Sequence, residues 1–276
     1  MTETDAIPKK YMLKKAKTHK GRLHIADTLP KVVEDPKQCA YINTNNSSEI
    51  MKLVLQELYL MRTSFSVRLQ KKNILGHVFE NPHNIEYLTG KNNCGLFAYS
   101  SDTKKRPMNL VLGNLFNAKL LDMFEFEVTN FIPASFFETK VKFEPNSQPI
   151  LIFSGEQFET EKCLERFKKF VMDYFKQDYL EEVNITDLKR ILVFCVDAEG
   201  TVKVRSYQTF SNTEYSLHDI KLEETGPSFD LKPRRNHLAP DDEYKLACKQ
   251  PITIKGINKK NRINSLIDVK AKVFTS

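Results

Sequence analysis

Apolar side chains recur at helical spacing in two stretches of the chain. In the first stretch, residues 49–62, one helical face would carry Ile50, Met51, Val54, Leu55, Leu58 and Tyr59. Ser48 stands before it and is a favourable N-cap, because its hydroxyl can accept a hydrogen bond from a free backbone N–H. The second stretch, residues 160–176, has Thr160 as its expected cap and a longer apolar face made of Cys163, Leu164, Phe167, Phe170, Val171, Tyr174 and Phe175. Both stretches are expected to form helices that pack on a core.

Shorter apolar runs predict strands. Residues 95–100 and 108–113 flank a polar segment, residues 101–107, which is expected to be the tip of a hairpin. Next along the chain, an alternation typical of a strand with one face in water is formed by Phe124, Phe126 and Val128 with Glu125 and Glu127. In the second part of the chain a short buried strand is expected at residues 150–153. Three more strands are expected at residues 191–196, 201–210 and 219–225.

The order of these elements is repeated along the chain. Asn81 and Pro82 are expected to begin a short helix that ends near Gly90, and residues 133–148 connect the two parts. A helix followed by mainly antiparallel strands thus occurs twice. This order predicts a mixed α/β fold built of two similar halves, with a basic arm before it and a basic tail after it. The expected boundaries are residues 1–26 for the arm, 27–145 and 146–232 for the halves, and 233–276 for the tail.

The stretch 219–237 marks the expected end of the folded body. Ile220 and Leu222 alternate with charged residues as on a half-buried strand. Gly226-Pro227 then ends the run, because proline has no N–H to donate to a ladder. An ordinary exit from a strand into a turn has the same spacing. Within the tail that follows, residues 241–249 are expected to form a helix.

Charge is distributed unevenly along the chain. The formal net charge is +7, but residues 1–26 carry +5, residues 27–231 carry −5 and residues 232–276 carry +7. A mildly acidic body therefore has two basic ends, and such ends commonly meet a polyanion such as a nucleic acid. A nuclear localisation signal or a solvated segment would have the same composition, so these interpretations stay open.

The candidate RNA-binding residues lie in the arm, at the expected hairpin tip and in the tail. A hairpin would hold cations at fixed positions for phosphate contact, whereas the two ends would order only against the RNA. In chain order these residues are Lys9, Lys10, Lys14, Lys15, Lys17, Lys20, Arg22, Lys104, Lys105, Arg106, Arg234, Arg235, His237, Lys259, Lys260 and Arg262.

The sequence predicts no catalytic residue, metal site, cofactor or small-molecule substrate. The 5 cysteines include no Cys-x-x-Cys, which favours reduced thiols over a zinc site or a disulfide framework. The histidines form no His-Glu-x-x-His motif, and Gly90 and Gly95 are followed by Leu96 where a P-loop has Lys. We therefore expect no enzyme, and an RNA-modifying enzyme is the alternative from another class.

The N-terminal sequence predicts a soluble intracellular protein without a membrane anchor. The first thirty residues lack the apolar segment of a signal peptide. In the whole chain no run approaches the roughly 18 apolar residues that span a bilayer.

The end of the predicted body resembles the closing signature of the Brix-domain family of ribosome-assembly proteins. Glu223 is followed by Gly226-Pro227 and then by 229–232, Phe-Asp-Leu-Lys, with Arg and His further on. The family usually has Arg directly after Gly-Pro, where this chain has Ser228, so a contact made by that Arg is not implied here. Upstream, residues 91–94 and 148–155 are also similar to the family, and the resemblance covers roughly residues 80–240. Its signature residues in this chain are Gly155, Phe158, Gly226, Pro227 and Asp230.

The resemblance implies a two-half α/β domain and a place in the nucleolus. For the family member that it fits best, it also implies a heterodimer with the protein called regulator of ribosome synthesis. The partners so implied are 5S rRNA, pre-60S rRNA and the two ribosomal proteins that accompany 5S rRNA. Together the two factors would bring this 5S particle onto the large-subunit precursor. A Brix-family factor that acts on another pre-ribosomal RNA is the alternative within the family.

Overall fold

The computed structural model describes residues 17–28, 36–44, 47–69, 78–137, 148–176, 190–211 and 220–249. The chain divides into two units, one made of residues 1–34 with 248–276 and the other of residues 35–247. In the first unit the structure describes a helix, α1 (His19–Thr28). Its first turn is held by Thr18, whose hydroxyl accepts a hydrogen bond from the Gly21 N–H at 3.1 Å. The arm that was expected to be flexible therefore contains a helix.

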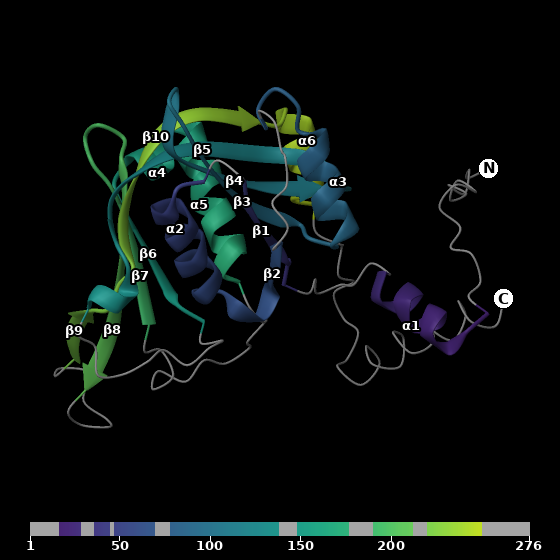
Figure 1. Ribbon diagram of the computed structural model, residues 1–276, viewed down its shortest axis with the longest axis horizontal. Coiled ribbons are helices and arrows are strands. Elements are labelled where there is room, and N and C mark those ends of the chain that lie inside the picture. The colour runs from purple at the N-terminus through teal and green to yellow at the C-terminus, as the bar shows by residue number, and fades with distance from the viewer. Residues whose placement is uncertain are drawn as a thin grey trace, which may run out of the picture. The chain divides into compact units, whose positions relative to one another are not determined.

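The second unit is a mixed α/β domain in which a curved sheet surrounds two helices (Figure 1). Its strands are β1 (Cys39–Asn43), β2 (Ser66–Leu69), β3 (Leu96–Thr103), β4 (Arg106–Phe116), β5 (Lys119–Ile132), β6 (Ile150–Ser154), β7 (Arg190–Val196), β8 (Val202–Ser211), β9 (Ile220–Glu224) and β10 (Ser228–Leu238). Its helices are α2 (Glu49–Leu60), α3 (His83–Lys91), α4 (Gln157–Thr160), α5 (Lys162–Phe175) and α6 (Asp241–Ala247), with 3-10 turns η2 (Thr63–Phe65) and η3 (Ala134–Phe136).

One sheet of 10 strands runs through both halves in the order β2-β1-β3-β4-β5-β10-β8-β7-β6, and β9 pairs with β8 beside this path. In the first half β1 is parallel to β3, and β4 and β5 follow antiparallel. In the second half β6 is parallel to β7, and β8 and β10 follow antiparallel. Each half thus contains the same series of pairings, one parallel and then two antiparallel, from an outer strand to the central β5–β10 pair. This confirms the predicted mixed α/β fold of two similar halves.

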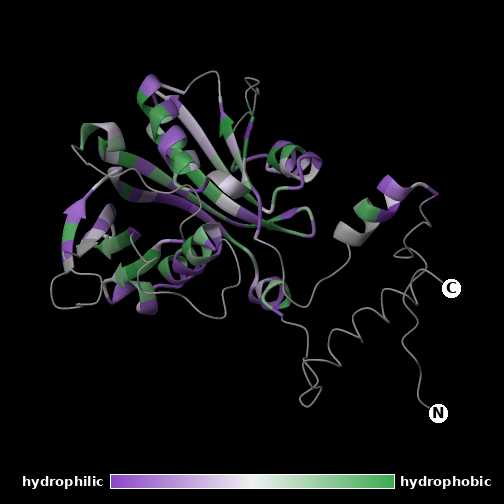
Figure 2. Ribbon diagram, turned by 90° about the horizontal axis from the view of Figure 1, so that it is seen from below, coloured by the Kyte–Doolittle hydropathy of each residue, from purple (hydrophilic) through white to green (hydrophobic). Residues whose placement is uncertain are grey.

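The larger core fills the inner face of the sheet. It is built around the apolar faces of α2 and α5, as their spacing predicts except for Ile50, which is exposed, and the Ser48 hydroxyl caps α2 by accepting from the Met51 N–H. The sheet contributes alternate residues of its strands, among them Phe124, Phe126 and Val128 of β5. Figure 2 shows hydrophobic and hydrophilic residues interleaved along these elements, as expected where one side of each faces a core.

Tyr41 of β1 and Tyr174 of α5 meet where the two halves join. Their hydroxyls are hydrogen-bonded to each other. Both also lie within hydrogen-bonding distance of the Leu58 carbonyl at the end of α2, at 3.2 and 3.4 Å. Burial raises the pKa of both phenols, so these groups stay neutral and act as a polar joint between β1, α2 and α5.

A smaller core lies on the outer face of the first half. Helix α3 packs there through Ile85, against a cluster that includes Phe97 of β3 and Met123 of β5. The Asn81 side chain accepts from the His83 N–H at the start of α3, and Asn93 ends the helix with a φ of 53°. The prediction of a short helix from Asn81-Pro82 to near Gly90 is confirmed.

A buried ion pair fastens α6 to the rest of the domain. Arg166 of α5 and Asp122 of β5 are almost fully buried and lie 2.9 Å apart. The same guanidinium donates to the Ala239 carbonyl and to Asp241, both at 2.8 Å, and its carbon lies 4.1 Å from the Tyr244 ring centroid. The predicted helix after residue 241 is therefore held against α5.

Three predictions about single elements are corrected. Thr160 ends α4, and Glu161 is the N-cap of α5. Residues 150–154 form an edge strand that is half exposed, not a buried one, because no described strand pairs with its outer side. Glu125 was expected on a wet face of β5 but is 2% exposed, because two arginines cover it.

The largest correction concerns the expected tail. Residues 233–238 continue β10, which pairs with β5 on one side and β8 on the other in the middle of the sheet. The second unit also includes α6 and runs to residue 247. The tail boundary at 233 is therefore wrong, because the basic segment is paired with long-range partners that its own composition does not reveal.

Candidate nucleic-acid interface

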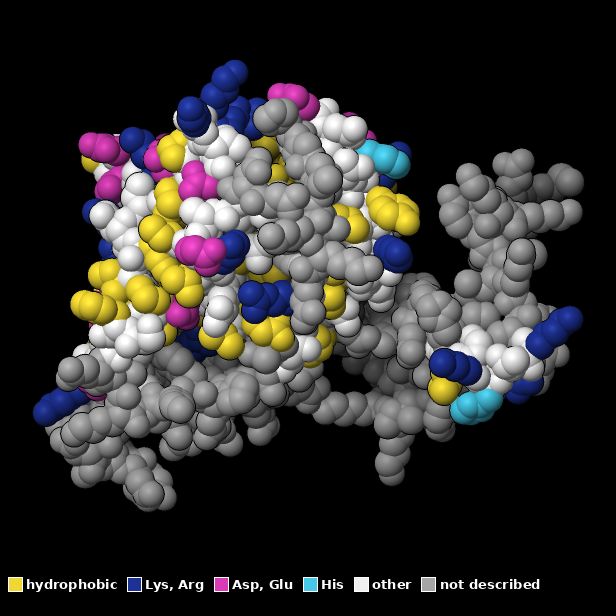
Figure 3. Space-filling model, viewed as in Figure 1, with side chains coloured by type: hydrophobic (Ala, Val, Ile, Leu, Met, Phe, Trp, Pro, Cys, Tyr) yellow, Lys and Arg dark blue, Asp and Glu magenta, His cyan; other side chains and the backbone are white. Residues whose placement is uncertain are grey.

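The tip of the β3–β4 hairpin carries three of the predicted RNA-binding residues. Thr103 pairs with Arg106, so Lys104 and Lys105 form a two-residue turn, and both are exposed. Arg106 does not point into solvent as expected, because its guanidinium turns back and pairs with Glu125 of β5. In Figure 3 basic side chains project at the top of the domain, above this hairpin. Among the described residues Lys104 and Lys105 have no ion-pair partner, whereas Arg106 is held by a carboxylate.

A bulge in β10 brings two more arginines to the same face. Pro233 lies opposite Phe126 and Asn236 lies opposite Phe124, so Arg234 and Arg235 together oppose one residue of β5. In a regular strand successive side chains point to opposite faces. A bulge of two residues against one removes that alternation locally and re-aims a side chain. Both guanidiniums consequently reach the carboxylates of β5.

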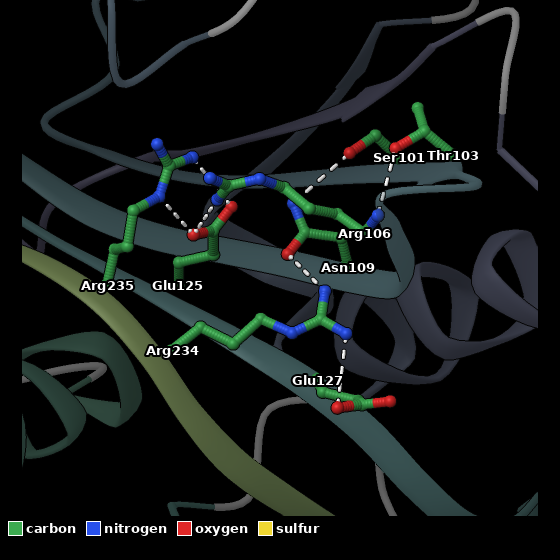
Figure 4. Close-up of polar contacts among 8 residues, drawn as sticks. All are labelled: Ser101, Thr103, Arg106, Asn109, Glu125, Glu127, Arg234 and Arg235. Atoms are coloured by element: carbon green, nitrogen blue, oxygen red, sulfur yellow. Dashed lines mark hydrogen bonds and ion pairs between the residues drawn. The ribbon is translucent and has the colours of Figure 1, made fainter.

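The two arginines make different contacts (Figure 4). Arg235 binds Glu125 with two hydrogen bonds, from Nε at 2.6 Å and from Nη2 at 3.1 Å. Arg234 pairs with Glu127 at 3.1 Å and donates to the Asn109 side-chain carbonyl at 3.3 Å. Arg234 and Arg235 were expected in a basic tail outside the folded body, and the structure places them on a strand with fixed partners.

Glu125 is the centre of this group. Its side chain is 1% exposed and pairs with both Arg106 and Arg235. Burial alone raises the pKa of its carboxyl, but the hydrogen bonds from Arg235 and Arg106 outweigh this effect and lower the pKa below its ordinary value of 4.5. The carboxylate is therefore charged at neutral pH and holds two guanidiniums, which together carry one more charge than it compensates.

An aromatic ring completes the support of Arg235. The guanidinium carbon lies 4.3 Å from the centroid of the Phe79 ring, which is a favourable cation–π distance. A guanidinium held between a carboxylate and a ring is oriented before any ligand arrives, so less side-chain entropy is lost on binding. We call the group made of Lys104, Lys105, Arg106, Arg234, Arg235, Glu125 and Glu127 the arginine cluster.

Of the remaining predicted cations that the structure describes, His237 lies in the same unit and outside this cluster. His237 is exposed further along β10. Lys17, Lys20 and Arg22 are exposed at and on α1, in the other unit. The predictions for Lys9, Lys10, Lys14, Lys15, Lys259, Lys260 and Arg262 fall outside the described residues.

The signature glycines have structural roles. Gly155 and Gly226 have φ values of 126° and 65°, which side chains with a Cβ adopt at a cost. A Cβ on Gly226 would also collide with the Phe137 ring. The peptide bond from Gly226 to Pro227 is cis.

The other signature residues are buried. Phe158 packs its ring 5.3 Å from that of Phe153, and Asp230 pairs with Arg205 at 2.7 Å and accepts from Asn130 at 2.8 Å. Ser228, at the position where the resemblance has Arg, is 4% exposed. These buried contacts are structural, and the contact of Asp230 with Asn130 joins the second half to β5 of the first.

Sequence reasoning missed the acidic members of the cluster. Glu125 and Glu127 were interpreted as a solvated strand face, and Phe79 and Asn109 were not singled out. A signal was present in the carboxylates spaced two apart on an otherwise apolar strand, a spacing that places both on one face. Among the described residues no group of three or more potential metal ligands occurs, and no helix is long and apolar enough to cross a membrane.

Comparison with known proteins gives a consistent result. A model of the Brix domain matches residues 44–235. The mouse protein "Ribosome production factor 2 homolog" is 34% identical over 248 residues, which are 90% of this chain and 80% of that protein. The human homolog is 33% identical with the same coverage. A crystal structure of a probable ribosomal biogenesis protein from Aeropyrum pernix K1 covers 74% of this chain and 97% of its own, with a TM-score of 0.42 and 7% identity.

Proposed function

Because this chain belongs to the Brix-domain family and is a ribosome biogenesis factor, we propose that it is a non-catalytic factor that binds ribosomal RNA of the large-subunit precursor. The arginine cluster is the single observation that supports RNA binding most directly. Its five cations face two carboxylates, so the group is cationic, and Lys104 and Lys105 stand free at its edge. Phosphate contacts of this kind supply most of the affinity of RNA-binding proteins.

The proposed RNA is 5S rRNA in its complex with two ribosomal proteins, which the factor would help to recruit into pre-60S particles in the nucleolus. Similarity to the mouse ribosome production factor 2 homolog over 90% of the chain supports this choice within the family. We propose that the factor acts as a heterodimer with the regulator of ribosome synthesis protein.

A hollow between the edge strand β6 and helix α5 supports a protein partner. It has a volume of about 620 Å³, and its lining includes the apolar residues Leu151, Phe153 and Met172. It is also lined by Lys168, Lys169 and Lys176, and by Asp173, which pairs with Lys37. An edge strand offers unpaired N–H and C=O groups to an extended peptide. The surface therefore suits a partner segment that is extended, apolar on one side and acidic on the other.

RNA binding is tested by the salt dependence of affinity. Each phosphate neutralised on single strands steepens the dependence of log K on log salt by about 0.7, and on duplexes by about 0.9. The change Lys104→Glu with Lys105→Glu should therefore lower the slope for 5S rRNA by about 1.4 to 1.8. Lys221→Glu on β9, an exposed lysine at the opposite end of the domain in Figure 1, is the matched control. An unchanged slope in the double variant would argue against this face.

Preference for 5S rRNA is a separate measurement. Affinities for 5S rRNA, a 5.8S fragment and a small-subunit fragment should be compared for the complex with the regulator protein. Equal affinities would favour a general RNA-binding factor of the family.

Met172→Glu in the hollow should weaken the 1:1 complex with the regulator protein in gel filtration. An unaffected complex would place the partner elsewhere.

A further inference from the structure

An aromatic side chain stands exposed on the outer side of α3. Tyr87 is 62% exposed, and His83 and Lys91 lie one turn before and one turn after it. Residues four apart share one face of a helix. Figure 3 shows a histidine, a hydrophobic and a basic side chain in succession along the outside of α3. This face is opposite to Ile85, which packs into the smaller core.

The helix leaves open space beside this ring. Gly90 lies one turn after Tyr87 with an ordinary helical backbone, and a Cβ built on it would meet nothing within 4 Å. The left-handed residue that ends the helix is Asn93, so the backbone does not require glycine at position 90. Glycine inside a helix costs about 1 kcal/mol relative to alanine. The residue therefore lowers helix stability and keeps a bare surface next to the ring.

A further cation stands near this face. Glu86 accepts a hydrogen bond from the Leu120 N–H at 2.9 Å, which holds the tip of the β4–β5 hairpin against α3. Lys119 at that tip is exposed. Tyr87 thus shares its helical face with Lys91, and the neighbouring Glu86 contacts the hairpin that carries Lys119.

We infer that Tyr87, with the bare surface at Gly90, is a stacking platform for an unpaired RNA base, and that Lys91 and Lys119 contact the flanking phosphates. Base-to-aromatic stacking combined with cations beside the ring is the usual way in which proteins hold single-stranded RNA. The inference rests on the RNA binding proposed above and adds to it a preference for unpaired residues.

The test compares two RNAs with equal numbers of phosphates, one single-stranded and one a perfect hairpin duplex. The full chain, in its complex with the partner where that is needed for solubility, is titrated with each at several salt concentrations. Tyr87→Ala should weaken single-strand binding roughly five- to one-hundredfold and leave duplex binding unchanged. Tyr87→Phe should retain wild-type affinity, because the ring is kept.

Two further variants separate stacking from folding and from charge. Gly90→Gln should raise the melting temperature yet weaken single-strand binding, because its side chain occupies the bare surface. Lys91→Ala should lower the salt slope by about 0.7, whereas Tyr87→Ala should leave the slope unchanged, because stacking releases no counterions. Phe136→Ala, at another exposed aromatic residue, is the control and should leave the affinity for both RNAs unchanged.

The outcomes are distinguishable. Full single-strand binding by Tyr87→Ala and Gly90→Gln would overturn the platform and leave the arginine cluster standing. Equal losses for single strand and duplex would also overturn it, as would loss of partner binding without loss of RNA binding. Absence of RNA binding by the wild-type protein would overturn the proposed function and this inference together.

Discussion

Arg235 binds both carboxylate oxygens of Glu125, with its Nε 2.6 Å from one oxygen and its Nη2 3.1 Å from the other. The two residues are 110 positions apart in the chain. Charge-assisted bidentate pairs are stronger and more directional than neutral hydrogen bonds. The central pair of strands is therefore joined by an ion pair in addition to its backbone ladder.

Replacing the carboxylate at this joint should destabilise the domain. Glu125→Gln leaves Arg106 and Arg235 beside each other without a compensating charge. Loss of one member of a buried ion pair costs about 3 to 5 kcal/mol, and partial exposure of both arginines reduces the expected cost to about 2 kcal/mol. Urea unfolding measures it. Glu127→Gln, where the carboxylate is 29% exposed, is the control and should cost less than about 1 kcal/mol.

The cost of Glu125→Gln should also depend on pH. The pKa of Glu125 is lowered in the folded state, so the stability it contributes is present above its ordinary value of 4.5 and is lost as the pH falls through the folded value. The difference in free energy of unfolding between wild type and variant should therefore shrink as the pH falls below 4.5. A difference that stays constant under acid would contradict the assignment.

The Arg166–Asp122 pair should control the attachment of α6. In Asp122→Asn the buried guanidinium loses its buried carboxylate partner and keeps only the more exposed Asp241, and we expect a loss of about 3 kcal/mol. Because Arg166 also holds Asp241 and the Ala239 carbonyl, amide hydrogen exchange in α6 should accelerate. Lys162→Ala, which removes only the exposed pair of Asp241 with Lys162, should change both readouts little. Slow exchange in α6 of the Asp122 variant would refute this role.

Three glycines should respond differently to alanine. At Gly113 a Cβ would lie 2.6 Å from the Phe97 ring and 2.7 Å from the Asp122 carbonyl oxygen, and at Gly226 it would collide with Phe137 at a φ of 65°. Both changes should cost more than about 2 kcal/mol. Gly90→Ala should instead stabilise by up to about 1 kcal/mol. Thermal melting of the three variants gives the ranking, and a destabilising Gly90→Ala would show an unseen packing role.

The thiols should differ in reactivity. Cys248 is exposed, whereas Cys39 is fully buried and burial raises its pKa to about 12. The thiolate is the reactive form, so a maleimide should label Cys248 first and Cys39 only after unfolding. Mass spectrometry of the labelled protein, with Cys248→Ser as the control, checks this order. Early labelling of Cys39 would mean that β1 opens readily.

Local patterns were sufficient for the elements that bury one face along their own length. The apolar stripes of α2 and α5 and the cap at Ser48 are recognisable without any tertiary partner, because helix periodicity and capping are local. A hairpin was likewise expected from the polar segment 101–107 between two apolar runs, although the strands extend into that segment and the turn itself is Lys104-Lys105. These parts of the fold and this part of the site were predicted from the sequence.

Long-range pairing explains what was missed. Residues 233–238 have the composition of a tail, yet they continue β10 and pair with β5, and the adjoining Phe229 and Leu231 are buried where β10 also pairs with β8. Glu125 has the composition of a wet strand face, yet it is covered by arginines from a hairpin and from β10. Neither the pairing of residues 233–238 nor the burial of Glu125 can be inferred locally, because each depends on a strand pairing about 100 residues away in sequence.

The position of β10 means that the sheet can be completed only late in synthesis of the chain. Among the described strands β10 is the last to be synthesised, yet it pairs with both β5 and β8, so a nascent chain that ends before residue 228 lacks the strand that joins its two halves and leaves an edge of β5 unpaired. Open strand edges pair with other chains. The nascent protein therefore depends on timely synthesis of β10. A translational pause before β10 has left the ribosome would leave the edges of β5 and β8 available for pairing with neighbouring polypeptides.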